Sequence, residues 1–266
     1  MKLIWMSDLH FEAEGLVLGH DPRARLRAAA AHIAEHHAEA AACLITGDLV
    51  ETGTLQNYKA LQGILNDLPM PVLPMAGNHD DRDALRAVLP LPDGALPGFV
   101  QYRAEAGGLS LLCLDTLIPG EAGGFLCAER MGWLQAELEA LNGRPAIAAM
   151  HHPPLKLGLP MLDPDNLRNG EVLLELLSGY PNVLHLLAGH VHRPCSGTAK
   201  GIPFTTARSV LYQAPPPRPA WDWSSFQPAA EAPALTVLEF ANGCLTLQHC
   251  QFCDYALGVA AAPGAA

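Results

Sequence analysis

Positive charge is scarce in this sequence of 266 residues. Lys and Arg together number 16, against 27 Asp and Glu, and the formal net charge at pH 7 is -11. Proteins that bind nucleic-acid polymers usually carry a basic face, so this balance argues against such a partner. An anionic small molecule would still need local positive charge, which bound metal cations can supply within an acidic protein. The charge balance therefore favours a metal-dependent site for any anionic substrate.

Long apolar runs are lacking too. No run approaches membrane-spanning length, and only residues 2–6 precede the polar Ser7-Asp8, too short a stretch for the core of a signal peptide. The 7 cysteines, an odd number, suit a reducing compartment. Cys250 and Cys253 form the only CxxC pair, which we interpret as structural. We expect a cytoplasmic protein that does not associate with a membrane.

The composition indicates a folded globule. Hydrophobic residues make up 50% of the sequence and charged residues 16%, which argues against extended disorder. The length allows a sizeable core, and α/β folds of this size are commonly one domain. We expect a single domain over residues 1–257, in which residues 202–257 supply C-terminal strands that form a cap or a dimer contact. Residues 258–266, rich in Ala and Gly, are expected to form a flexible tail.

Short apolar runs separated by helical patterns indicate an α/β fold. The runs with the composition of buried strands are residues 3–6, 42–46, 71–76, 146–150 and 183–188. We expect the run at residues 71–76 to be the central strand of a parallel sheet. Paired strands at residues 99–104 and 109–115, and a hairpin turn at Asn242-Gly243, predict antiparallel pairing as well. The sheets should therefore be mixed.

Each of these runs ends in side chains of the kinds that bind metal ions. The candidate ligands are Asp8, His10, Asp48, Asn78, His151, His190 and His192. Any one strand end has an ordinary explanation as a turn, since Gly, Asn and Asp favour turns. Together they are hard to explain in that way, because open α/β sheets bind ligands at the carboxyl ends of their strands. A donor set of imidazole and oxygen without thiolate favours Fe, Mn, Zn or Co.

The order of these blocks, DxH, GD, GNH, H and GHxH, resembles that of the calcineurin-like metallophosphoesterases from Asp8 to His192. Residues 77–80 (Gly-Asn-His-Asp), 150–154 (Met-His-His-Pro-Pro) and 162–170 are similar to segments of bacterial class III cyclic nucleotide phosphodiesterases and related glycerophosphodiesterases. The resemblance implies a four-layer α/β/β/α sandwich, in which two mixed sheets are flanked by helices and a dinuclear site lies at the strand ends.

The resemblance also implies what the ligands do. One divalent metal ion would be bound by Asp8, His10 and His192, a second by Asn78, His151 and His190, and both would be bridged by Asp48. A hydroxide shared by two metals attacks phosphorus in line with the leaving alkoxide. We expect hydrolysis of small soluble phosphodiesters, such as a 3',5'-cyclic nucleotide like cAMP or a glycerophosphodiester. The alternatives are a phosphomonoesterase on the same site and a non-catalytic metal-binding scaffold.

Further residues are expected close to the substrate. By resemblance, His79 acts with Asp48 in catalysis, contacts the phosphate and assists the leaving oxygen, and Asn78 lies beside it. His152 either packs behind the ligands or contacts substrate. Asn169 is either a helix N-cap or an amide of the substrate pocket.

Two more features have local explanations beside the functional ones. Asp80 either orients a neighbouring histidine or caps the following helix. The Trp221-Asp222-Trp223 loop is expected to form a cap or a homodimer contact near the mouth of the active site, with packing on its own domain as the alternative. The assembly would be a homodimer or a higher homo-oligomer.

Overall fold

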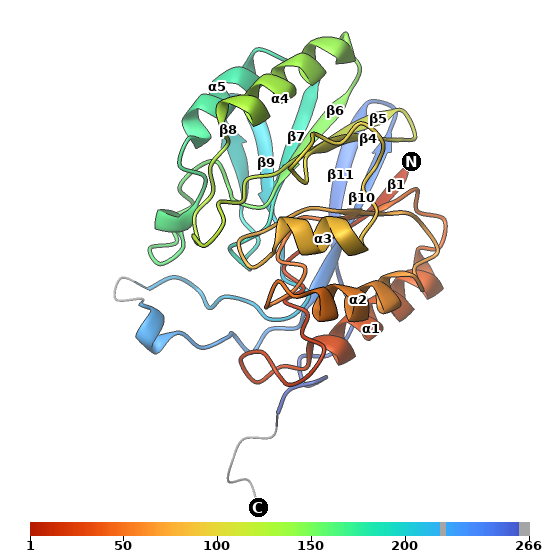
Figure 1. Cartoon of the computed structure of the whole chain (residues 1–266), viewed down its shortest axis with the longest axis vertical. Coiled ribbons are helices and arrows are strands. Elements are labelled where there is room, and N and C mark those ends of the chain that lie inside the picture. Colours follow the sequence, from red (N-terminus) through yellow and green to blue (C-terminus); the bar gives the residue numbers. More distant parts are fainter. Residues whose placement is uncertain (219–221, 261–266) are drawn as a thin grey trace, which may run out of the picture.

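The chain forms two β-sheets that pack face to face, as a computed structural model describes for residues 1–218 and 222–260 (Figure 1). The first sheet has the order β11 (Cys244–Gln251), β10 (Ala234–Ala241), β1 (Lys2–Met6), β2 (Cys43–Ile45) and β3 (Val72–Pro74). β1, β2 and β3 are parallel, and β10 pairs with β1 in the antiparallel sense. The β10–β11 hairpin turns at Asn242-Gly243 as predicted, and both residues have the positive φ that such a tight turn requires.

The second sheet is also mixed. Its order is β4 (Tyr102–Ala106), β5 (Leu109–Leu114), β6 (Ala146–Met150), β7 (Val183–Ala188), β9 (Ile202–Thr206) and β8 (Ser196–Ala199). β5, β6, β7 and β9 are parallel, and the strands at the two edges, β4 and β8, are antiparallel to their neighbours. The predicted pairing of two strands around Gly107-Gly108 is that of β4 with β5.

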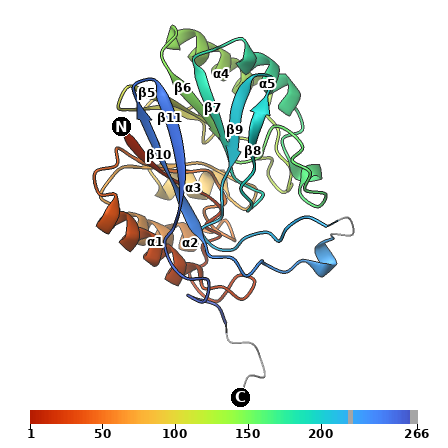
Figure 2. The same ribbon diagram turned by 180° about the vertical axis from the view of Figure 1, so that it is seen from behind.

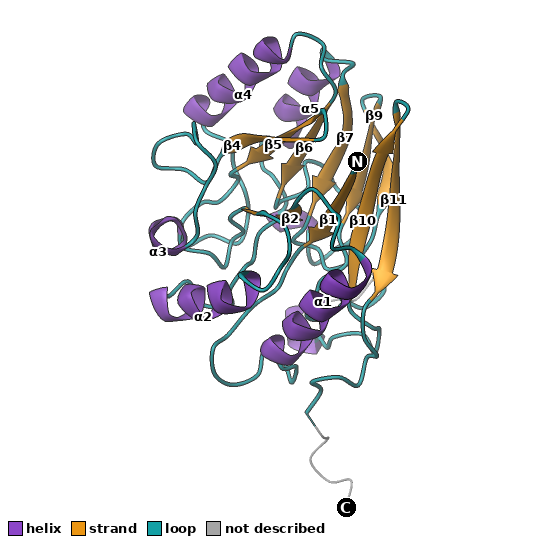
Figure 3. Ribbon diagram, turned by 90° about the vertical axis from the view of Figure 1, so that its right-hand side faces the viewer, coloured by secondary structure: helices purple, strands orange, loops and turns teal. Residues whose placement is uncertain are grey.

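Helices cover the outer face of each sheet (Figure 3). The first sheet carries α1 (Pro22–His36), α2 (Leu55–Leu65) and α3 (Arg82–Val88), and the second carries α4 (Ala128–Leu141) and α5 (Gly170–Ser178). α1 begins as its sequence suggests, because the Asp21 side chain accepts hydrogen bonds from the first-turn N–H groups of Arg23 and Ala24. The predicted four-layer α/β/β/α sandwich is confirmed.

Strands in the middle of the sandwich are buried on both faces and serve two cores. In β5, Leu111 and Cys113 pack in the core between the sheets, together with Trp5 of β1. Leu112 and Leu114, on the opposite face, pack in the core beneath α4 and α5. This two-sided burial explains the near-continuous apolar runs of the sequence, since alternate side chains of a strand point to opposite faces. The strands are thereby fixed on both sides, and so are the residues at their ends.

The position of β3 corrects one prediction. β3 is the edge strand of the first sheet rather than its centre, and only Val72–Pro74 of the predicted run belong to it. The reason lies in Pro71 and Pro74, because proline has no N–H for a sheet and is accommodated at edges. The strand nevertheless brings its carboxyl end to the same edge as β1 and β2.

The chain between β9 and β10 leaves both sheets and returns to them (Figures 1 and 2). It contains a short 3₁₀ helix, η2, at Trp223–Ser225. Trp221 of the predicted loop lies outside the described residues. A second 3₁₀ helix, η1 (Asp163–Asp165), lies between β6 and α5. These two turns face the site described below.

Hydrogen-bonded structure in the C-terminal segment extends to residue 260, beyond the predicted start of the tail. A flexible tail is expected from Gly258, but the Asp21 N–H donates to the Gly258 carbonyl at 2.6 Å and the Ala260 N–H donates to Gly19 at 2.8 Å. Residues 258–260 therefore lie against the loop before α1, and residues 261–266 are outside the described part. Within residues 1–218 and 222–260, no helix has the length and apolarity needed to cross a bilayer.

Candidate metal centre

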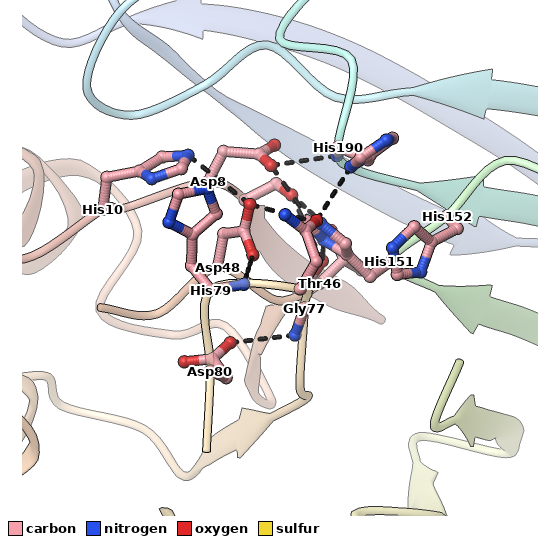
Figure 4. A network of polar contacts seen from close by, with 12 residues as sticks. Asp8, His10, Thr46, Asp48, Gly77, His79, Asp80, His151, His152 and His190 are labelled. Atoms are coloured by element: carbon pink, nitrogen blue, oxygen red, sulfur yellow. Dashed lines mark hydrogen bonds and ion pairs between the residues drawn. The ribbon is translucent and has the colours of Figure 1, made fainter. Parts of the chain in front are cut away.

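Five strand ends from the two sheets converge on one point (Figure 4). β1, β2 and β3 contribute from the first sheet, and β6 and β7 from the second. The structure brings together all of the predicted ligands, namely Asp8, His10, Asp48, Asn78, His151, His190 and His192. Pairing of parallel strands within each sheet places their carboxyl ends side by side, and the packing of the sheets then brings the two sets face to face.

The first cluster comprises Asp8, His10, Asp48 and His192, whose ligand atoms lie within 4.8 Å of one another. The Nε2 atoms of His10 and His192 are only 2.9 Å apart. Each ring has an acceptor at its other nitrogen, because His10 Nδ1 is 2.7 Å from the Glu51 carboxylate and His192 Nδ1 is 3.0 Å from the Tyr212 carbonyl. The proton of each neutral ring therefore belongs on Nδ1, which leaves two Nε2 lone pairs facing each other. A metal cation suits this arrangement.

The second cluster gathers around the amide oxygen of Asn78. This Oδ1 atom lies 3.1 Å from His151 Nε2 and 3.0 Å from His190 Nδ1. His151 Nδ1 donates to the Thr46 carbonyl at 2.8 Å, which again turns the Nε2 lone pair inward. Asn78 and the two imidazoles thus present three lone-pair donors to one position.

Asp48 lies between the clusters. Its Oδ2 atom is 3.5 Å from His10 Nε2 in the first cluster and 3.3 Å from His151 Nε2 in the second. Asp8 adds a buried Oδ2 atom that has no hydrogen-bond partner among the described residues. An orphaned buried carboxylate oxygen is costly unless a cation neutralises it. The donor set therefore fits two metal ions, with Asp48 in the position to contact both.

The electrostatics of the site favour a cation. Burial opposes the charged form of His151, but the neighbouring Asp48 carboxylate outweighs this and raises the pKa of His151 to about 9. Burial would likewise raise the pKa of Asp48, yet the adjacent His151 holds it well below its usual value. The carboxylates thus create a negative potential in which positive charge is stabilised.

Unusual backbone conformations accompany the ligands. Positive φ angles occur at Asp8 (54°), His10 (41°), Asp48 (48°), His190 (71°) and His192 (48°). Non-glycine residues rarely adopt this region, and the surrounding fold must hold them there. Such strain is typical of functional sites, and here it affects five of the predicted ligands.

Two glycines next to the ligands have no room for a side chain. A Cβ atom on Gly47 would lie 2.6 Å from His151 Nδ1, and Gly47 also has a φ of 90°. A Cβ atom on Gly77 would lie 2.3 Å from Asp48 Oδ1. Any larger residue would displace a ligand, so these glycines are required for the close approach of the loops.

His79 reaches the site without filling a ligand position. Its backbone N–H donates to Asp48 Oδ1 at 3.0 Å, and its ring Nδ1 donates to the Glu51 carbonyl at 3.0 Å. Nε2 makes no hydrogen bond with a described residue, and the side chain lines the cavity above the metal clusters. The ring thus presents Nε2 to whatever enters that cavity.

Both ring nitrogens of His152 are engaged by the protein, as expected for the first of its two predicted roles, packing behind the ligands. His152 is fully buried, with Nδ1 2.7 Å from the Thr116 hydroxyl and Nε2 3.0 Å from the Ala122 carbonyl, so both ring nitrogens are occupied. Burial lowers the pKa of His152 to about 3. It packs behind the ligands, with its ring centroid 4.7 Å from that of His190.

Asn169 occupies the N-cap position of α5 but makes no capping hydrogen bond with its side chain. Its amide instead accepts from the Leu126 N–H at 3.1 Å and donates to the Leu126 carbonyl at 2.8 Å. This pairing directs the amide away from the metal clusters, and Asn169 does not line their cavity. Its role is to fix the loop before α4.

Glu51 is a site residue that the sequence analysis missed. Its Oε2 atom lies 2.7 Å from His10 Nδ1 and 3.6 Å from His79 Nδ1. Burial opposes its ionisation, but the hydrogen bond to His10 lowers the pKa of Glu51. The only available signal was a carboxylate three residues after Asp48 in the same loop. The Glu51 carboxylate thus orients His10, and the Glu51 backbone carbonyl, which accepts from His79 Nδ1, orients His79.

Asp80 performs neither of its predicted roles, because the helix cap is Asp81, whose side chain accepts from the Ala84 N–H. The buried Asp80 carboxylate instead accepts from the N–H groups of Leu49 at 3.1 Å and Gly77 at 2.8 Å. Leu49 follows Asp48, and Gly77 precedes Asn78. Asp80 therefore ties together the two loops that carry these ligands.

The ligands form the floor of an open cavity of about 150 Å³. We define the floor as the seven predicted ligands together with His79; the members that line the cavity directly are His10, Asp48, Asn78, His79, His190 and His192. Above it stands an outer wall, defined as Leu162, Asp165, Val191, Tyr212, Trp223 and Phe226. No Lys or Arg is found among the described residues that line the cavity. The predicted position of Trp223 near the mouth of the site is confirmed.

A four-layer sandwich with a candidate dinuclear metal site at its strand ends defines the class of metallophosphoesterases. The sequence profile of the calcineurin-like phosphoesterases matches residues 1–194. The chain belongs to this family.

Relatives and solved structures agree with this assignment. The chain is 36% identical over 217 residues to a probable cyclic nucleotide phosphodiesterase of Rhodopseudomonas palustris, an alignment that covers 80% of this chain and 79% of the relative. It is 31% identical to a glycerophosphodiester phosphodiesterase of Enterobacter lignolyticus, over 69% of this chain and 68% of the relative. A dimetal phosphatase of Danio rerio shares the fold with a TM-score of 0.70 at 15% identity, over 95% of this chain and 96% of that structure.

Proposed function

We propose that this protein hydrolyses small phosphodiesters with the help of two divalent metal ions. The observation that carries the proposal is the position of Asp48 between two clusters of inward-facing lone pairs, below an open cavity. Asp8, His10 and His192 would hold one ion, Asn78, His151 and His190 the other, and Asp48 both. When bound, such a pair supplies a nucleophile at neutral pH and neutralises charge on the phosphoryl oxygens.

The residues of this chain position the substrate above the ions. In its imidazolium form, His79 can donate from Nε2, which has no partner among the described residues, either a hydrogen bond to a phosphoryl oxygen or a proton to the leaving alkoxide. The contact of Nδ1 with the Glu51 carbonyl holds the ring in the orientation that presents Nε2. We therefore assign His79 to leaving-group assistance and Glu51 to the orientation of His79.

The charge of the cavity favours a diester over a phosphomonoester. A phosphomonoester carries close to two negative charges at neutral pH, whereas a diester carries one. The described lining offers no Lys or Arg to a second charge, and it includes the Asp165 carboxylate. Its outer wall is otherwise largely apolar, which suits the second organic substituent of a diester. The names of the relatives point to cyclic nucleotides and glycerophosphodiesters as substrates.

The donor types favour Fe, Mn, Zn or Co as the native metals. The test is to strip the protein with a chelator, reload it with each metal, and measure metal content and rates. The panel comprises cAMP, glycerophosphocholine, bis(p-nitrophenyl) phosphate and p-nitrophenyl phosphate. We expect two ions per chain and faster hydrolysis of the aryl diester than of the aryl monoester. An active protein with one ion or none, or a preference for the monoester, would contradict the proposal.

We also propose that the segment around Trp223 takes part in a homodimer contact. A large exposed aromatic side chain on a segment that leaves the sheets is typical of an interface, and Trp223 is 59% exposed in the monomer. Small-angle scattering should give the mass of a dimer. A monomer at micromolar concentration would contradict this proposal without affecting the catalytic one.

A further inference from the structure

Three aromatic rings of the outer wall form an angular surface. The ring centroids of Trp223 and Phe226 are 5.4 Å apart with an interplanar angle of 45°. Those of Phe226 and Tyr212 are 6.2 Å apart with an angle of 70°. The rings therefore meet as the sides of a corner and do not form a parallel slot.

A carboxylate lines the same cavity. Asp165, at the end of η1, makes no side-chain hydrogen bond or ion pair with a described residue, and the nearby Arg168 pairs with Glu121 instead. The cavity thus combines aromatic faces and an unpaired negative charge above a floor suited to a phosphate. These are the two elements that stabilise an organic cation, because a ring face attracts positive charge and a carboxylate adds Coulombic attraction.

We propose that the outer wall binds an organic ammonium group carried by the phosphodiester, as in a choline ester of glycerol phosphate. This inference rests on the proposed phosphodiesterase function and specifies its substrate class. The phosphate would lie over the floor, and the ammonium group would lie between the rings of Trp223 and Tyr212 and the Asp165 carboxylate. Trp223 lines the cavity and is 59% exposed in the monomer, so a group bound on the cavity side has ring surface to cover, and the proposed dimer contact concerns the side that faces away from the cavity.

A nucleobase fits the same wall less well. A flat base gains most from a ring parallel to its own plane, whereas successive rings here are inclined by 45° and 70°. A rounded trimethylammonium group contacts inclined rings equally well, as in the aromatic cages that bind quaternary ammonium ligands. The geometry and the carboxylate together favour the cation.

A matched pair of substrates tests the proposal. Glycerophosphocholine is compared with its neutral isostere, the glycerophosphate ester of 3,3-dimethylbutanol, in which carbon replaces the quaternary nitrogen. The two esters have nearly the same shape, but the ammonium group also makes choline the more acidic leaving alcohol. The ratio of their kcat/KM values therefore combines recognition of the positive charge with leaving-group reactivity, and the wall substitutions, which do not change the leaving group, isolate the recognition. For the metal-loaded wild type we expect a ratio of about 10 in favour of the choline ester, a typical magnitude for a cation held by aromatic rings.

Two substitutions locate the effect. Trp223→Leu removes a ring at an exposed position, and Asp165→Asn removes the charge at nearly constant volume; each should lower the ratio by about 3-fold or more. Asp67→Asn is the matched control, because Asp67 is an exposed carboxylate in the turn after α2 and lies outside the cavity. It should leave the ratio unchanged, which shows that net charge alone does not set the preference. Metal content is measured for every variant.

The outcomes separate this inference from the proposed function. Hydrolysis of bis(p-nitrophenyl) phosphate by the wild type, with a choline-to-isostere ratio that is near 1 or that neither wall substitution lowers, would overturn the ammonium proposal and leave the phosphodiesterase intact. A kcat/KM for cAMP at least 10-fold above that for glycerophosphocholine, reduced by Trp223→Leu, would also overturn it and assign the wall to a base. Failure to hydrolyse any diester would instead overturn the proposed function itself.

Discussion

The floor and the outer wall of the cavity are built from different kinds of chain. The floor comes from strand ends that two cores hold in place, and its ligands are buried, several of them with positive φ. The outer wall comes from connections and from the two 3₁₀ helices, with Asp165 in η1 and Trp223 in η2. Residues on connections between elements are free to vary without disturbing a core. The comparison suggests that the floor sets the reaction and that the wall selects among substrates.

Substitutions in the floor and in the outer wall should therefore affect different measured quantities. A change in the floor should slow all esters or alter metal binding, because every substrate needs the same phosphate chemistry. A change in the outer wall should alter the ratio between esters, as in the choline test above. The floor should therefore respond to substitution as one unit, in contrast to a partly buried histidine elsewhere in the fold.

The largest effect is expected for Asp48→Asn. The substitution keeps the volume but removes the charge that lies within 3.5 Å of ligand nitrogens in both clusters. We expect loss of both metal ions and a fall in kcat/KM beyond about 10⁴-fold for every diester, since residues that act as a unit fail together. Elemental analysis and rates measure this, with Asp67→Asn as the exposed control. Retention of one tightly bound ion would show that the clusters are independent.

The next effect is expected for His79→Ala, which should keep both metal ions because all of the assigned ligands remain. Loss of a proton donor to the leaving alkoxide should slow an alkyl diester by about 10²- to 10⁴-fold. An aryl diester needs little protonation and should slow much less, so the ratio of the two losses reports the role. Loss of metal, or equal slowing of both esters, would instead assign His79 to metal or phosphate binding.

Glu51→Gln should have a smaller effect. The amide is close in shape to the carboxylate, but it lacks the charge that lies 2.7 Å from His10 Nδ1 and 3.6 Å from His79 Nδ1. We expect a 10- to 100-fold loss of affinity for the metal held by His10, about the range for residues that support metal ligands. Competition with a chromophoric chelator measures it. The ratio of alkyl to aryl rates should stay the same, because His79 Nδ1 donates to the backbone carbonyl of Glu51, which the substitution keeps. Unchanged metal affinity would restrict the Glu51 side chain to a packing role.

The floor was largely predictable from sequence, and the reason is physical. A buried parallel strand is recognised by its apolar run, and its carboxyl end is known to face the site, so ligands such as Asp8 and His151 follow from local patterns. Glu51 was missed because its contact with His10 joins residues 41 positions apart and depends on how two loops close. Sequence identifies the strand ends more readily than the residues that orient them.

The wall was much less predictable. Leu162, Asp165, Tyr212 and Trp223 come from separate connections that share no periodic pattern. Only Trp223 was placed near the mouth, on the basis of its proline-rich surroundings. Asn169 does occupy the N-cap position that the sequence indicates. Its side-chain amide, however, pairs with the backbone of Leu126 and does not cap the helix. Side chains on connections take their directions from tertiary contacts, which one sequence does not reveal.

The smallest effect concerns a partly buried histidine outside the floor, His185 in β7. It is partly buried and faces the Thr205 hydroxyl, at 2.9 Å from Nε2, and no carboxylate among the described residues contacts it. Burial therefore lowers the pKa of His185 to about 4, whereas Asp48 raises that of His151. The ordinary value for histidine is about 6.5. The contrast between His185 and His151 shows that the carboxylates of the floor raise the pKa of a neighbouring histidine, whereas burial alone lowers it.

The sign of the pH effect follows from this lowered pKa. Above pH 6.5, His185 is neutral in both the folded and the unfolded state, so its titration does not change the free energy of unfolding. As the pH falls from 6.5 towards 4, His185 becomes protonated in the unfolded chain but stays neutral in the folded protein. The free energy of unfolding therefore declines by at most about 1.4 kcal/mol per pH unit. His185→Gln should remove this part of the decline. Urea unfolding of the metal-free wild type and variant at pH 7.5 and pH 5 measures it, and metal-ligand titrations cancel in the difference between the two proteins. A stability difference that stays the same at both pH values would mean that His185 titrates normally, and that enclosure alone does not distinguish it from the histidines of the floor.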